Sequence, residues 1–449
     1  MDAEDGLVPR GIPRHKAVPG TSFVIDGFAI SPAGMESASV FFLTHAHADH
    51  YGGLSSGFRK PIYCTTITAS LVVMKLGVDR SVMRIIDPGQ TVVVDSVEVS
   101  AIDANHCPGA VQFLFRLPNN QKFIHSGDTR FCESMKENEL LRQFRSARIL
   151  YLDTTYCHPK HTFPDQDEAI RYVVDKVLEE EREEEAKGRA LYLISSYNIG
   201  KERIFVALIR ATGKKIFCTR RKREHLELLN IPELTAALTD DPTCTNVHLV
   251  RWNELGPHFR PYFDKMEERR AKYGAARTVA FVPTGWVYTK KNGGFGVRES
   301  GQDSLHLVPY SEHSSFDELV SFVSFIRPEQ VIPTVSCSES DRMLRHFKGL
   351  VDENSAKRRF LQAFGMPARP PTVKKEEDEE GGEWALELLM AATGVTAGRA
   401  GELLARASGS AERAASLFFE GGEGGGGASV RTSRQTSLSA FFSPPKKRV

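Results

Sequence analysis

The sequence predicts an α/β protein in which a sheet-rich segment is interrupted by a segment of alternating helices and strands. Three observations predict this class. From about Thr21 to Leu152, short apolar runs rich in Val, Ile and Phe alternate with turn residues, which is typical of strands. Helical and strand-like patterns then alternate to about residue 275, and strand-like runs return after it. A chain of 449 residues is too long for one ordinary core, so we expect two or three domains.

The elements follow in order along the chain. The first strands are predicted at SFVIDGFAI, SVFFLTH, PIYCT, TVVVDSVEVSAIDA, AVQFLFRL, KFIHSGD and ARILYLD. The middle segment is predicted to have helices at 165–187 and GKERIFVALIRATG, and strands at LYLISS, KIFC and VHLV. The returning strands are predicted at TVAFVPTGW, SLHLVPYSEHSS and QVIPTVS, with helices at 316–326 and 340–350 packing on them. A domain interrupted by an inserted α/β domain explains this order.

The C-terminal part has a different composition. Residues 366–383 are rich in Pro and charge and predict a linker. Residues 384–421 contain three short amphipathic segments, which predict a small helical module. Residues 422–449 begin with a glycine-rich stretch and predict a disordered tail.

Composition excludes several classes of protein. The 58 basic and 57 acidic side chains give a net charge of +1, so any basic surface for a polyanion must be local. The seven cysteines include no CxxC pair, which argues against a disulfide framework or a cysteine-type zinc finger. The sequence has no apolar run of membrane-spanning length and no signal-peptide core, so we expect a soluble, intracellular protein.

A dense cluster of metal-ligand residues follows the strand-like run VFFL. The segment THAHADH carries three imidazoles and one carboxylate within six residues, His45, His47, Asp49 and His50. Imidazole and carboxylate donors favour zinc or a similar divalent ion. His45 and His47 point the same way if the strand direction persists, whereas Asp49 and His50 can face a second ion.

Further ligand-type residues follow later strands. His106 lies in DANHCPGA, Asp128 in IHSGDTR, Asp153 at the end of ILYLD and His313 in PYSEHSS. Each alone is more often a structural polar residue or a cap. Because every one of them follows an apolar strand, as a set they predict convergence at one edge of a sheet.

At this point the sequence resembles a known family. The motifs HAHADH, ANHCPGA, SGDTR, LDTTYC, PTGW and PYSEHSS resemble the metallo-β-lactamase/β-CASP DNA cross-link repair nucleases, the Snm/Pso group with Apollo and Artemis. The resemblance covers roughly residues 16–350. It implies an αββα metallo-β-lactamase sandwich whose first part is 16–155 and whose returning part is 281–365. A β-CASP α/β domain would be inserted at 156–280.

The resemblance also implies roles for single residues. His45, His47 and His106 would hold one ion, with Asp49, His50 and His313 holding another and Asp128 bridging both. The cofactor would be Zn²⁺, one or two ions, or another divalent metal. The catalytic positions would be Asp49, His50, Asp128, Asp153 and His313, with Asp153 orienting neighbouring ligands. Val335 lies where DNA-directed members carry Val and RNA-directed relatives carry His, which favours DNA.

Two sets of residues are candidates for phosphate contact. The resemblance implies a 5′-phosphate pocket near PYSEHSS, formed by Ser311, Ser314, Ser315 and Lys201, with the PTGW turn as a further candidate. The alternative for the serines is helix capping ahead of FDELVSFV. Four basic residues in TRRKREH, Thr219–His225, also suit phosphate contact, although a solvated loop explains them as well.

The tail carries a pattern that resembles a sliding-clamp (PCNA) interacting peptide. Gln435, Leu438, Phe441 and Phe442 match its spacing, with the three apolar side chains forming a plug on one turn. The following SPPKKRV resembles a nuclear import signal, so we expect a nuclear protein. Residues 384–421 resemble a UBA-like module, which implies ubiquitin or a related partner; a structural or oligomerising bundle is the alternative.

Together the motifs predict a metal-dependent 5′→3′ DNA exonuclease acting in interstrand cross-link repair or replication-coupled repair. One alternative is a structure-selective, Artemis-like endonuclease. Another, from a different class, is a catalytically silent adaptor that joins clamp and ubiquitin signals. The adaptor is disfavoured because all seven metal-ligand positions are present, and the inserted segment disfavours a β-lactamase.

Overall fold

The computed structural model describes residues 10–196, 199–256, 261–287, 295–335, 337, 340–352, 402 and 405. The predicted linker, UBA-like module, tail and clamp peptide lie outside the described residues, except for 402 and 405. Residues 4–353 belong to one compact unit. No helix in the part of the chain that the structure describes is suited in length and apolarity to crossing a membrane.

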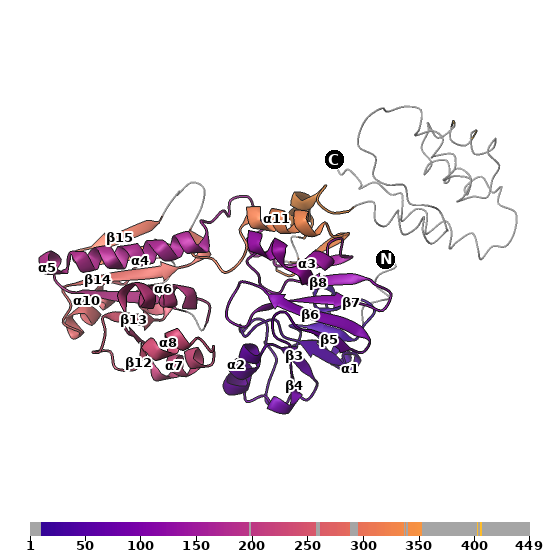
Figure 1. Ribbon diagram of the computed structural model, residues 1–449, viewed down its shortest axis with the longest axis horizontal. Helices are drawn as coiled ribbons and strands as arrows, with labels where there is room; N and C mark the ends of the chain where they lie inside the picture. Colours follow the sequence, from indigo (N-terminus) through magenta and orange to yellow (C-terminus); the bar gives the residue numbers. More distant parts are fainter. Residues whose placement is uncertain are drawn as a thin grey trace. The chain divides into compact units, whose positions relative to one another are not determined.

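Two sheets face each other in the first part of the chain (Figure 1). The smaller sheet is parallel in the order β1-β2-β3-β4, with β1 Phe23–Ile25, β2 Val40–Phe42, β3 Ile62–Cys64 and β4 Met83–Ile85. The larger sheet has the order β17-β9-β8-β7-β6-β5, with β5 Thr91–Val94, β6 Val97–Asp103, β7 Val111–Arg116, β8 Lys122–His125, β9 Ile149–Leu152 and β17 Gln330–Pro333. In the larger sheet β5 to β8 are antiparallel, while β8, β9 and β17 pair in parallel.

Successive side chains along a strand point to opposite faces of its sheet. The apolar residues therefore form one layer between the two sheets and one on the outer face of each sheet. Phe23, Ile25 and Phe42 of the smaller sheet pack in one cluster with Phe113 and Tyr151 of the larger sheet. Residues on the opposite face of the larger sheet, such as Leu114 and Leu150, pack instead against helices. The sandwich is therefore layered helix, sheet, sheet, helix, which confirms the predicted αββα architecture.

Helices cover both outer faces of this sandwich. Those on the smaller sheet include α2 (Thr66–Leu76), whose Leu71 and Val72 pack with Phe41 and Ile62. Helix α1 (Pro32–Ser37) connects β1 to β2, and its Met35 packs against the same cluster. The larger sheet is covered by α3 (Glu139–Gln143), α11 (Phe316–Ile326) and α12 (Ser340–Leu344). The helices predicted at 316–326 and 340–350 are present and pack on the sheet that contains β17, but not on β14 and β16, which were expected beside it. The second helix ends early and continues as a short 3₁₀ turn, Arg345–Phe347.

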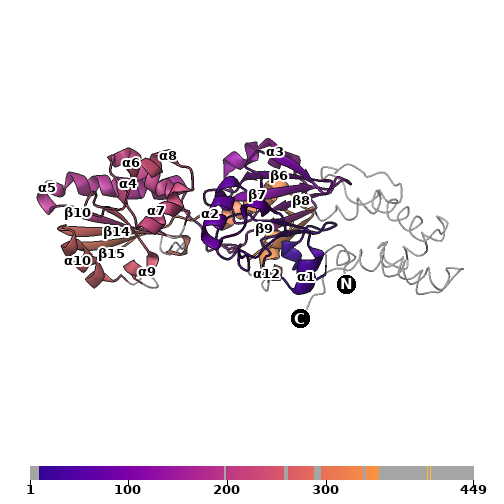
Figure 2. The ribbon, with the colours of Figure 1, turned by 90° about the horizontal axis from the view of Figure 1, so that it is seen from below.

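A third sheet forms the inserted α/β part. Its order is β12-β11-β13-β10-β14-β16-β15, with β10 Ala190–Ser195, β11 Ile216–Phe217, β12 Leu238–Thr239, β13 Val247–Val250, β14 Arg277–Pro283, β15 Gly296–Ser300 and β16 Asp303–Val308. All its pairs are parallel except β15 with β16. Figure 2 shows α4 and α6 on one face of this sheet and α10 on the other. Its helices are α4 Gln166–Arg182, α5 Glu184–Lys187, α6 Glu202–Thr212, α7 Arg220–Glu227, α8 Pro232–Ala237, α9 Trp252–Leu255 and α10 Phe263–Lys272.

The predicted point of return to the first domain was wrong. We expected TVAFVPTGW and SLHLVPYSEHSS to belong to the sandwich, with the return at residue 281. Instead β14 and β16 pair in parallel with each other, and β14 pairs with β10 of the inserted sheet. The chain returns after Val308, and only β17 rejoins the sandwich. Both faces of β14 and β16 are covered, so their apolar runs carry no signal for which sheet they join.

Candidate metal centre

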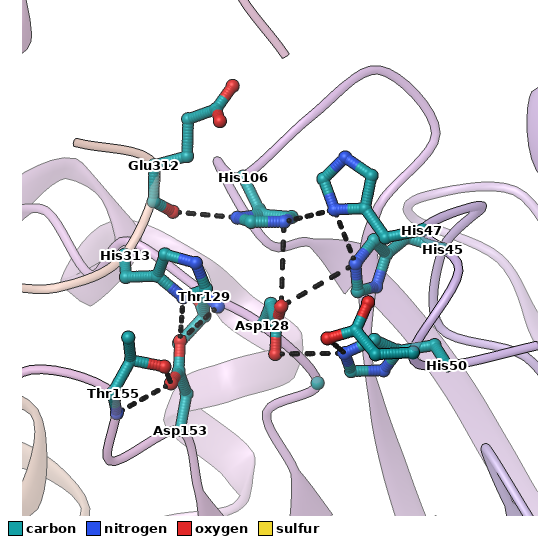
Figure 3. Close-up of polar contacts among 12 residues, drawn as sticks. His45, His47, His50, His106, Asp128, Thr129, Asp153, Thr155, Glu312 and His313 are labelled. Atoms are coloured by element: carbon teal, nitrogen blue, oxygen red, sulfur yellow. Dashed lines mark hydrogen bonds and ion pairs between the residues drawn. The ribbon is translucent and has the colours of Figure 1, made fainter. Parts of the chain in front are cut away.

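Four separate stretches of chain bring imidazole and carboxylate groups together at one edge of the sandwich. His45, His47 and His50 follow β2, whereas Asp128 follows β8. His106 follows β6, and His313 precedes α11. Figure 3 shows these side chains converging around Asp128. The structure therefore gathers the residues that the sequence predicted would meet.

A glycine allows Asp128 to approach the first histidine loop. Gly127 has φ +54°, and a Cβ on it would lie 2.8 Å from Cβ of Thr44. Only glycine fits this close approach without displacing Thr44. The turn after β8 can therefore pack against the residue just before His45.

One group of donors surrounds an oxygen of Asp128. Nε2 of His45 lies 3.6 Å and Nε2 of His106 3.7 Å from Oδ2 of Asp128. Nδ1 of His47 lies 3.0 Å from both of those imidazole nitrogens. A second group meets the other oxygen, with Nε2 of His50 at 3.2 Å from Oδ1 of Asp128.

The remaining predicted ligands lie at the edge of this cluster. An oxygen of Asp49 is 3.7 Å from Nε2 of His50, and the Asp49 side chain is 79% exposed. His313 stacks at a tilt beside His106, with 4.7 Å between ring centroids, and its ring nitrogens lie within reach of His106 and Asp128. The cluster is thus closed on the protein side and open towards solvent at Asp49.

Buried contacts fix the ring orientation of three of the histidines. Nδ1 of His313 lies 2.7 Å from Oδ2 of Asp153, and Nδ1 of His106 lies 2.9 Å from the carbonyl oxygen of Glu312. Nδ1 of His50 lies 2.7 Å from Oδ2 of Asp26. These acceptors hold a proton on Nδ1, so that Nε2 of each of these three rings turns towards Asp128 and would bind a metal ion through its lone pair when the ring is neutral.

Asp153 has the supporting position that was expected for it. It is 1% exposed, and besides His313 it accepts hydrogen bonds from the backbone N–H groups of Thr129 and Thr155 and from the Thr155 hydroxyl. It does not face Asp128 directly. Its role in the geometry is to orient His313.

Sequence reasoning missed Asp26 and Thr44. The carboxylate of Asp26 accepts hydrogen bonds from the backbone N–H of Thr44 at 2.9 Å and from its hydroxyl at 2.7 Å. That hydroxyl also lies 3.0 Å from Nδ1 of His45, so Asp26 supports both His45 and His50. Asp26 has no motif around it beyond the Asp-Gly turn in VIDGF, and the only available signal was its place after β1.

The electrostatics of the cluster suit a cation. Burial holds the pKa of His45 and His106 well below the usual value and lowers that of His47 to about 4. Burial would also raise the pKa of Asp128, but the charges of His50 and His313 outweigh it and keep the pKa low. Neutral imidazole lone pairs therefore face one another and a carboxylate across 3.0 to 3.7 Å.

Lone pairs turned towards a common point repel one another unless a cation lies between them. Donor separations of this size fit a divalent ion with bonds of about 2.0–2.2 Å to nitrogen and oxygen.

His50 and His313 differ from the other three rings in the direction of their pKa shift. Burial lowers the pKa of each, but the neighbouring carboxylates outweigh it, raising that of His50 well above its usual value and that of His313 to about 9.

Cys107 also lies among the potential donors, next to His45, His47 and His106. Burial raises the pKa of its thiol well above the usual value, and the charges of Glu312, Glu202 and Asp128 add to that effect. The sequence did not place Cys107 in the predicted ligand set, and the geometry makes it a further potential donor beside these three imidazoles.

The cluster lies in a cleft of about 690 Å³. Side chains from both the sandwich and the inserted part line it, among them His47, Asp49, Tyr156, Lys201 and Trp286. Val335 also lines the cleft. A site with one open side can admit substrate and water, unlike a closed structural metal site.

The four residues predicted for a 5′-phosphate pocket divide into two pairs. Ser311 and Lys201 line the cleft. Ser314 instead donates to the carbonyl of Thr129 and accepts from the backbone N–H of Phe131. Ser315 is the N-cap of α11, so capping is confirmed for this residue. Ser314 and Ser315 do not line the cleft, and the hydroxyl of Ser311 is itself held by the backbone N–H and carbonyl of His313. A phosphate pocket formed by these residues stays a prediction.

Lys201 and the basic run differ in what surrounds them. Nζ of Lys201 lies 2.7 Å from Oε2 of Glu312, and both side chains are nearly buried. The basic run begins at Thr219, which caps α7. Arg221 and Lys222 line a separate cleft of about 480 Å³ with Lys75 and Arg251.

The fold and the site together define a metallohydrolase of the metallo-β-lactamase type. Comparison with known proteins narrows this class. Residues 232–339 match the DNA repair metallo-beta-lactamase family, residues 19–177 the beta-lactamase superfamily domain and residues 385–425 a UBA-like domain. The chain belongs to the DNA cross-link repair family of metallo-β-lactamases. The predicted family and UBA-like module are thereby confirmed, and the fold and cluster imply that the chain binds a divalent metal.

Three relatives illustrate the likeness. The chain is 42% identical over 385 residues to the "DNA ligase 6" of Arabidopsis thaliana, covering 82% of the chain and 27% of that protein. It is 36% identical over 338 residues to the "DNA cross-link repair protein SNM1" of the same plant, covering 73% and 67%. It is 31% identical over 330 residues to the "5' exonuclease Apollo" of Gallus gallus, covering 71% and 63%. The chain thus spans about a quarter of the first relative and about two thirds of the other two.

Proposed function

We propose that the chain is a zinc-dependent nuclease that degrades DNA from its 5′ end during interstrand cross-link repair or replication-coupled repair. The observation that carries the proposal is the set of nitrogen and oxygen donors from four stretches of chain that face one another in an open cleft. The names of the plant cross-link repair and chicken 5′ exonuclease relatives support the substrate and the direction. Imidazole-rich donor sets favour zinc.

Each residue of the site has a role in this proposal. His45, His47 and His106 would hold one ion and Asp49, His50 and His313 a second, with Asp128 between them. When bound, divalent ions would supply water activated near neutral pH and neutralise charge on the phosphate. Asp26, Asp153 and the Glu312 carbonyl keep His50, His313 and His106 turned into the cleft.

The proposal is tested by metal analysis together with digestion of a 5′-phosphorylated oligonucleotide labelled at its 3′ end. We expect wild-type protein to shorten the labelled strand one nucleotide at a time, and Asp49→Ala, His50→Ala and Asp128→Asn to lower the rate by at least about 10³-fold. Asp175→Asn, an exposed position on α4, is the matched control and should leave the rate unchanged. Internal cuts would favour an endonuclease instead, and bound clamp with uncut DNA would favour an adaptor.

We also propose that the tail recruits the protein to the sliding clamp and that the basic SPPKKRV directs it to the nucleus. Phe441→Ala combined with Phe442→Ala should abolish clamp pull-down while sparing digestion of oligonucleotides. Retained pull-down would remove the case for recruitment. Binding of ubiquitin by 385–425 is the matching proposal for the UBA-like domain, tested by pull-down with immobilised ubiquitin.

A further inference from the structure

An exposed tryptophan stands on the lip of the metal cleft. The side chain of Trp286 is 61% exposed. Of the large apolar side chains exposed within the described residues, it is the one that lines this cleft. Leaving so much aromatic surface in water forgoes the free energy of burying it. An exposed aromatic ring at the entrance of a substrate cleft therefore indicates that the ring contacts the substrate.

The turn that carries Trp286 is firmly held. A Cβ on Gly285 would lie 2.7 Å from the hydroxyl oxygen of Tyr156 and 3.1 Å from Cβ of Ser311, so the backbone packs directly on both. The backbone N–H of Thr284 donates to the carbonyl of Val308 at 2.8 Å. The backbone that presents the indole to the cleft is thus packed against the buried residues Tyr156 and Ser311.

A series of rings leads from the metal cluster to Trp286. The ring centroids of His313 and Tyr156 are 6.0 Å apart, and those of Tyr156 and Trp286 are 5.0 Å apart with a tilt of 58°. His161 lies edge-on, 6.2 Å from the indole. Because Tyr156 is 3% exposed, it backs the indole from the protein side and leaves the rest of the indole open to the cleft.

We propose that Trp286, backed by Tyr156, is a stacking platform for the nucleobase adjacent to the phosphate at the metal cluster. This inference rests on the proposed nuclease function. A strand that places a phosphodiester at Asp128 must also place a neighbouring base near the cleft wall, two rings away from His313. Aromatic side chains bind bases of any sequence by stacking, because every base offers a flat face.

The position of Trp286 favours a base over an apolar protein segment. The same cleft exposes carboxylate and imidazole groups and is lined by His15, Lys16 and Lys201. Polar and charged walls of this kind suit a ligand that combines phosphates with flat rings. They would leave an apolar segment facing unpaired charges.

The kinetic test uses three 5′-phosphorylated oligonucleotides of one sequence, one intact and two lacking the base at the first or second nucleotide. Wild-type protein should have a higher KM for one of the two abasic substrates than for the intact one. Trp286→Ala should raise KM for the intact substrate by about 5-fold or more, with kcat nearly unchanged, and should abolish the discrimination. Trp286→Phe should retain most of it.

The matched control is Tyr262→Ala, an exposed aromatic position at the start of α10 that does not line the cleft. It should leave KM unchanged for all three substrates. If Trp286→Ala raises KM equally for intact and abasic substrates, or for none, the platform is refuted. A general loss of structure would alter kcat as well, and Trp286→Phe would then fail to rescue it.

A binding test needs no turnover. Trp252→Phe with Trp384→Phe leaves Trp286 as the single tryptophan in the full-length protein, which has three in all. Its fluorescence should be quenched by a cleavage-resistant phosphorothioate oligonucleotide, and less by the abasic form that wild type discriminates against. Binding is measured independently by the fluorescence anisotropy of a labelled oligonucleotide. Full binding by this measure, without quenching of Trp286, would overturn the inference. Absence of both binding and cleavage would instead refute the proposed nuclease function, and the inference with it.

Discussion

Asp26 orients two of the clustered histidines although it lies outside the predicted ligand set. Its carboxylate is buried, faces Nδ1 of His50 and accepts the Thr44 hydroxyl that faces His45. Burial alone would raise its pKa, but the charge and hydrogen bond of His50 outweigh burial and hold the pKa low. A permanently charged acceptor here increases the basicity of the ring nitrogen that faces Asp128.

Replacing Asp26 with Asn should therefore weaken metal binding without removing a ligand. The amide keeps one oxygen acceptor but loses the charge and presents an N–H₂ group where an acceptor is needed. We expect metal affinity to fall roughly 10- to 100-fold. Competition with a chromophoric chelator measures it, with Asp175→Asn as the exposed control. Unchanged affinity in Asp26→Asn would show that His50 is oriented without it.

The residues of the site differ in how far sequence could predict them. His45, His47, Asp49 and His50 form a dense local pattern, which is rare without a metal role. His106, Asp128 and His313 gained weight because each follows an apolar strand, and the structure places them together. Asp26 and the Glu312 carbonyl could not be predicted, because a lone carboxylate and a backbone oxygen acquire their partners only through tertiary contacts.

Ser315 shows at the level of a helix how one hydroxyl can be assigned. It caps α11 by accepting from the backbone N–H of Glu318, while the Glu318 carboxylate accepts from the backbone N–H of Ser315. Ser315→Ala should cost about 1 kcal/mol of stability. It should leave the KM for a 5′-phosphorylated oligonucleotide unchanged, because Ser315 is buried and does not line the cleft. A large rise in KM with unaltered urea denaturation would contradict the assignment as a cap.

Strand β16 carries a buried histidine that should make the inserted sheet sensitive to acid. His306 is 3% exposed, and its Nδ1 lies 2.8 Å from the hydroxyl of Tyr172 on α4. Its Nε2 lies 3.2 Å from the Ser304 hydroxyl. Burial, reinforced by the charge of Lys176, lowers its pKa from 6.5 to about 4, against the weaker opposing effect of Glu180 and Glu179.

The sign of the effect follows from linkage. Above pH 6.5 the ring is neutral in both folded and unfolded chains, so its full contribution to stability is present. Between pH 6.5 and 4 the unfolded chain binds a proton that the folded chain does not, so stability falls with pH. We expect wild type to lose about 2 kcal/mol more than His306→Gln on going from pH 7 to pH 5. Urea denaturation at both pH values measures this, and parallel losses would show that His306 is not the titrating group.

The inserted sheet also shows the limit of pattern reading at the level of elements. Helices at 165–187, in GKERIFVALIRATG and at 316–326 were predicted from a period of 3.6 and are present as α4, α5, α6 and α11. Strands β14 and β16 were predicted as strands but placed in the wrong sheet. Which sheet a buried strand joins depends on its hydrogen-bonding neighbours, and a continuous apolar run contains no information about them.

At the scale of the whole molecule, the ion pair between Lys201 and Glu312 joins the inserted part to the loop that supports the metal cluster. Lys201 is the N-cap of α6 in the inserted part, and Glu312 lies between β16 and α11. Their side chains are 12% and 11% exposed, with 2.7 Å between Nζ and Oε2. Because the carbonyl of Glu312 faces Nδ1 of His106, displacement of this loop would also disturb the cluster.

Two roles for Lys201 make opposite predictions. If Lys201 holds Glu312, Lys201→Met leaves a nearly buried carboxyl group without its cation. Because burial already raises the pKa of Glu312 to about 7 against the opposing charge of Lys201, the variant should lose up to about 3 kcal/mol at pH 8 and less at pH 6, where the carboxyl group is protonated. Adding Glu312→Leu should then restore most of the stability, because an apolar pair of similar size is often no worse than a buried ion pair. If Lys201 instead binds a 5′-phosphate, Lys201→Met should raise KM for 5′-phosphorylated but not 5′-hydroxyl oligonucleotides. In that case the double variant would keep the raised KM of Lys201→Met, even if its stability were restored.

We expect the first pattern to dominate, because a lysine already 2.7 Å from a carboxylate has lost much of its attraction for a second anion. Urea denaturation of wild type, both single variants and the double variant gives the coupling energy between the two side chains. Chelator competition on the same four proteins tests whether metal affinity falls with the single variant and recovers with the double. A coupling energy near zero, with metal affinity unchanged throughout, would show that the ion pair neither ties the two parts together nor supports His106.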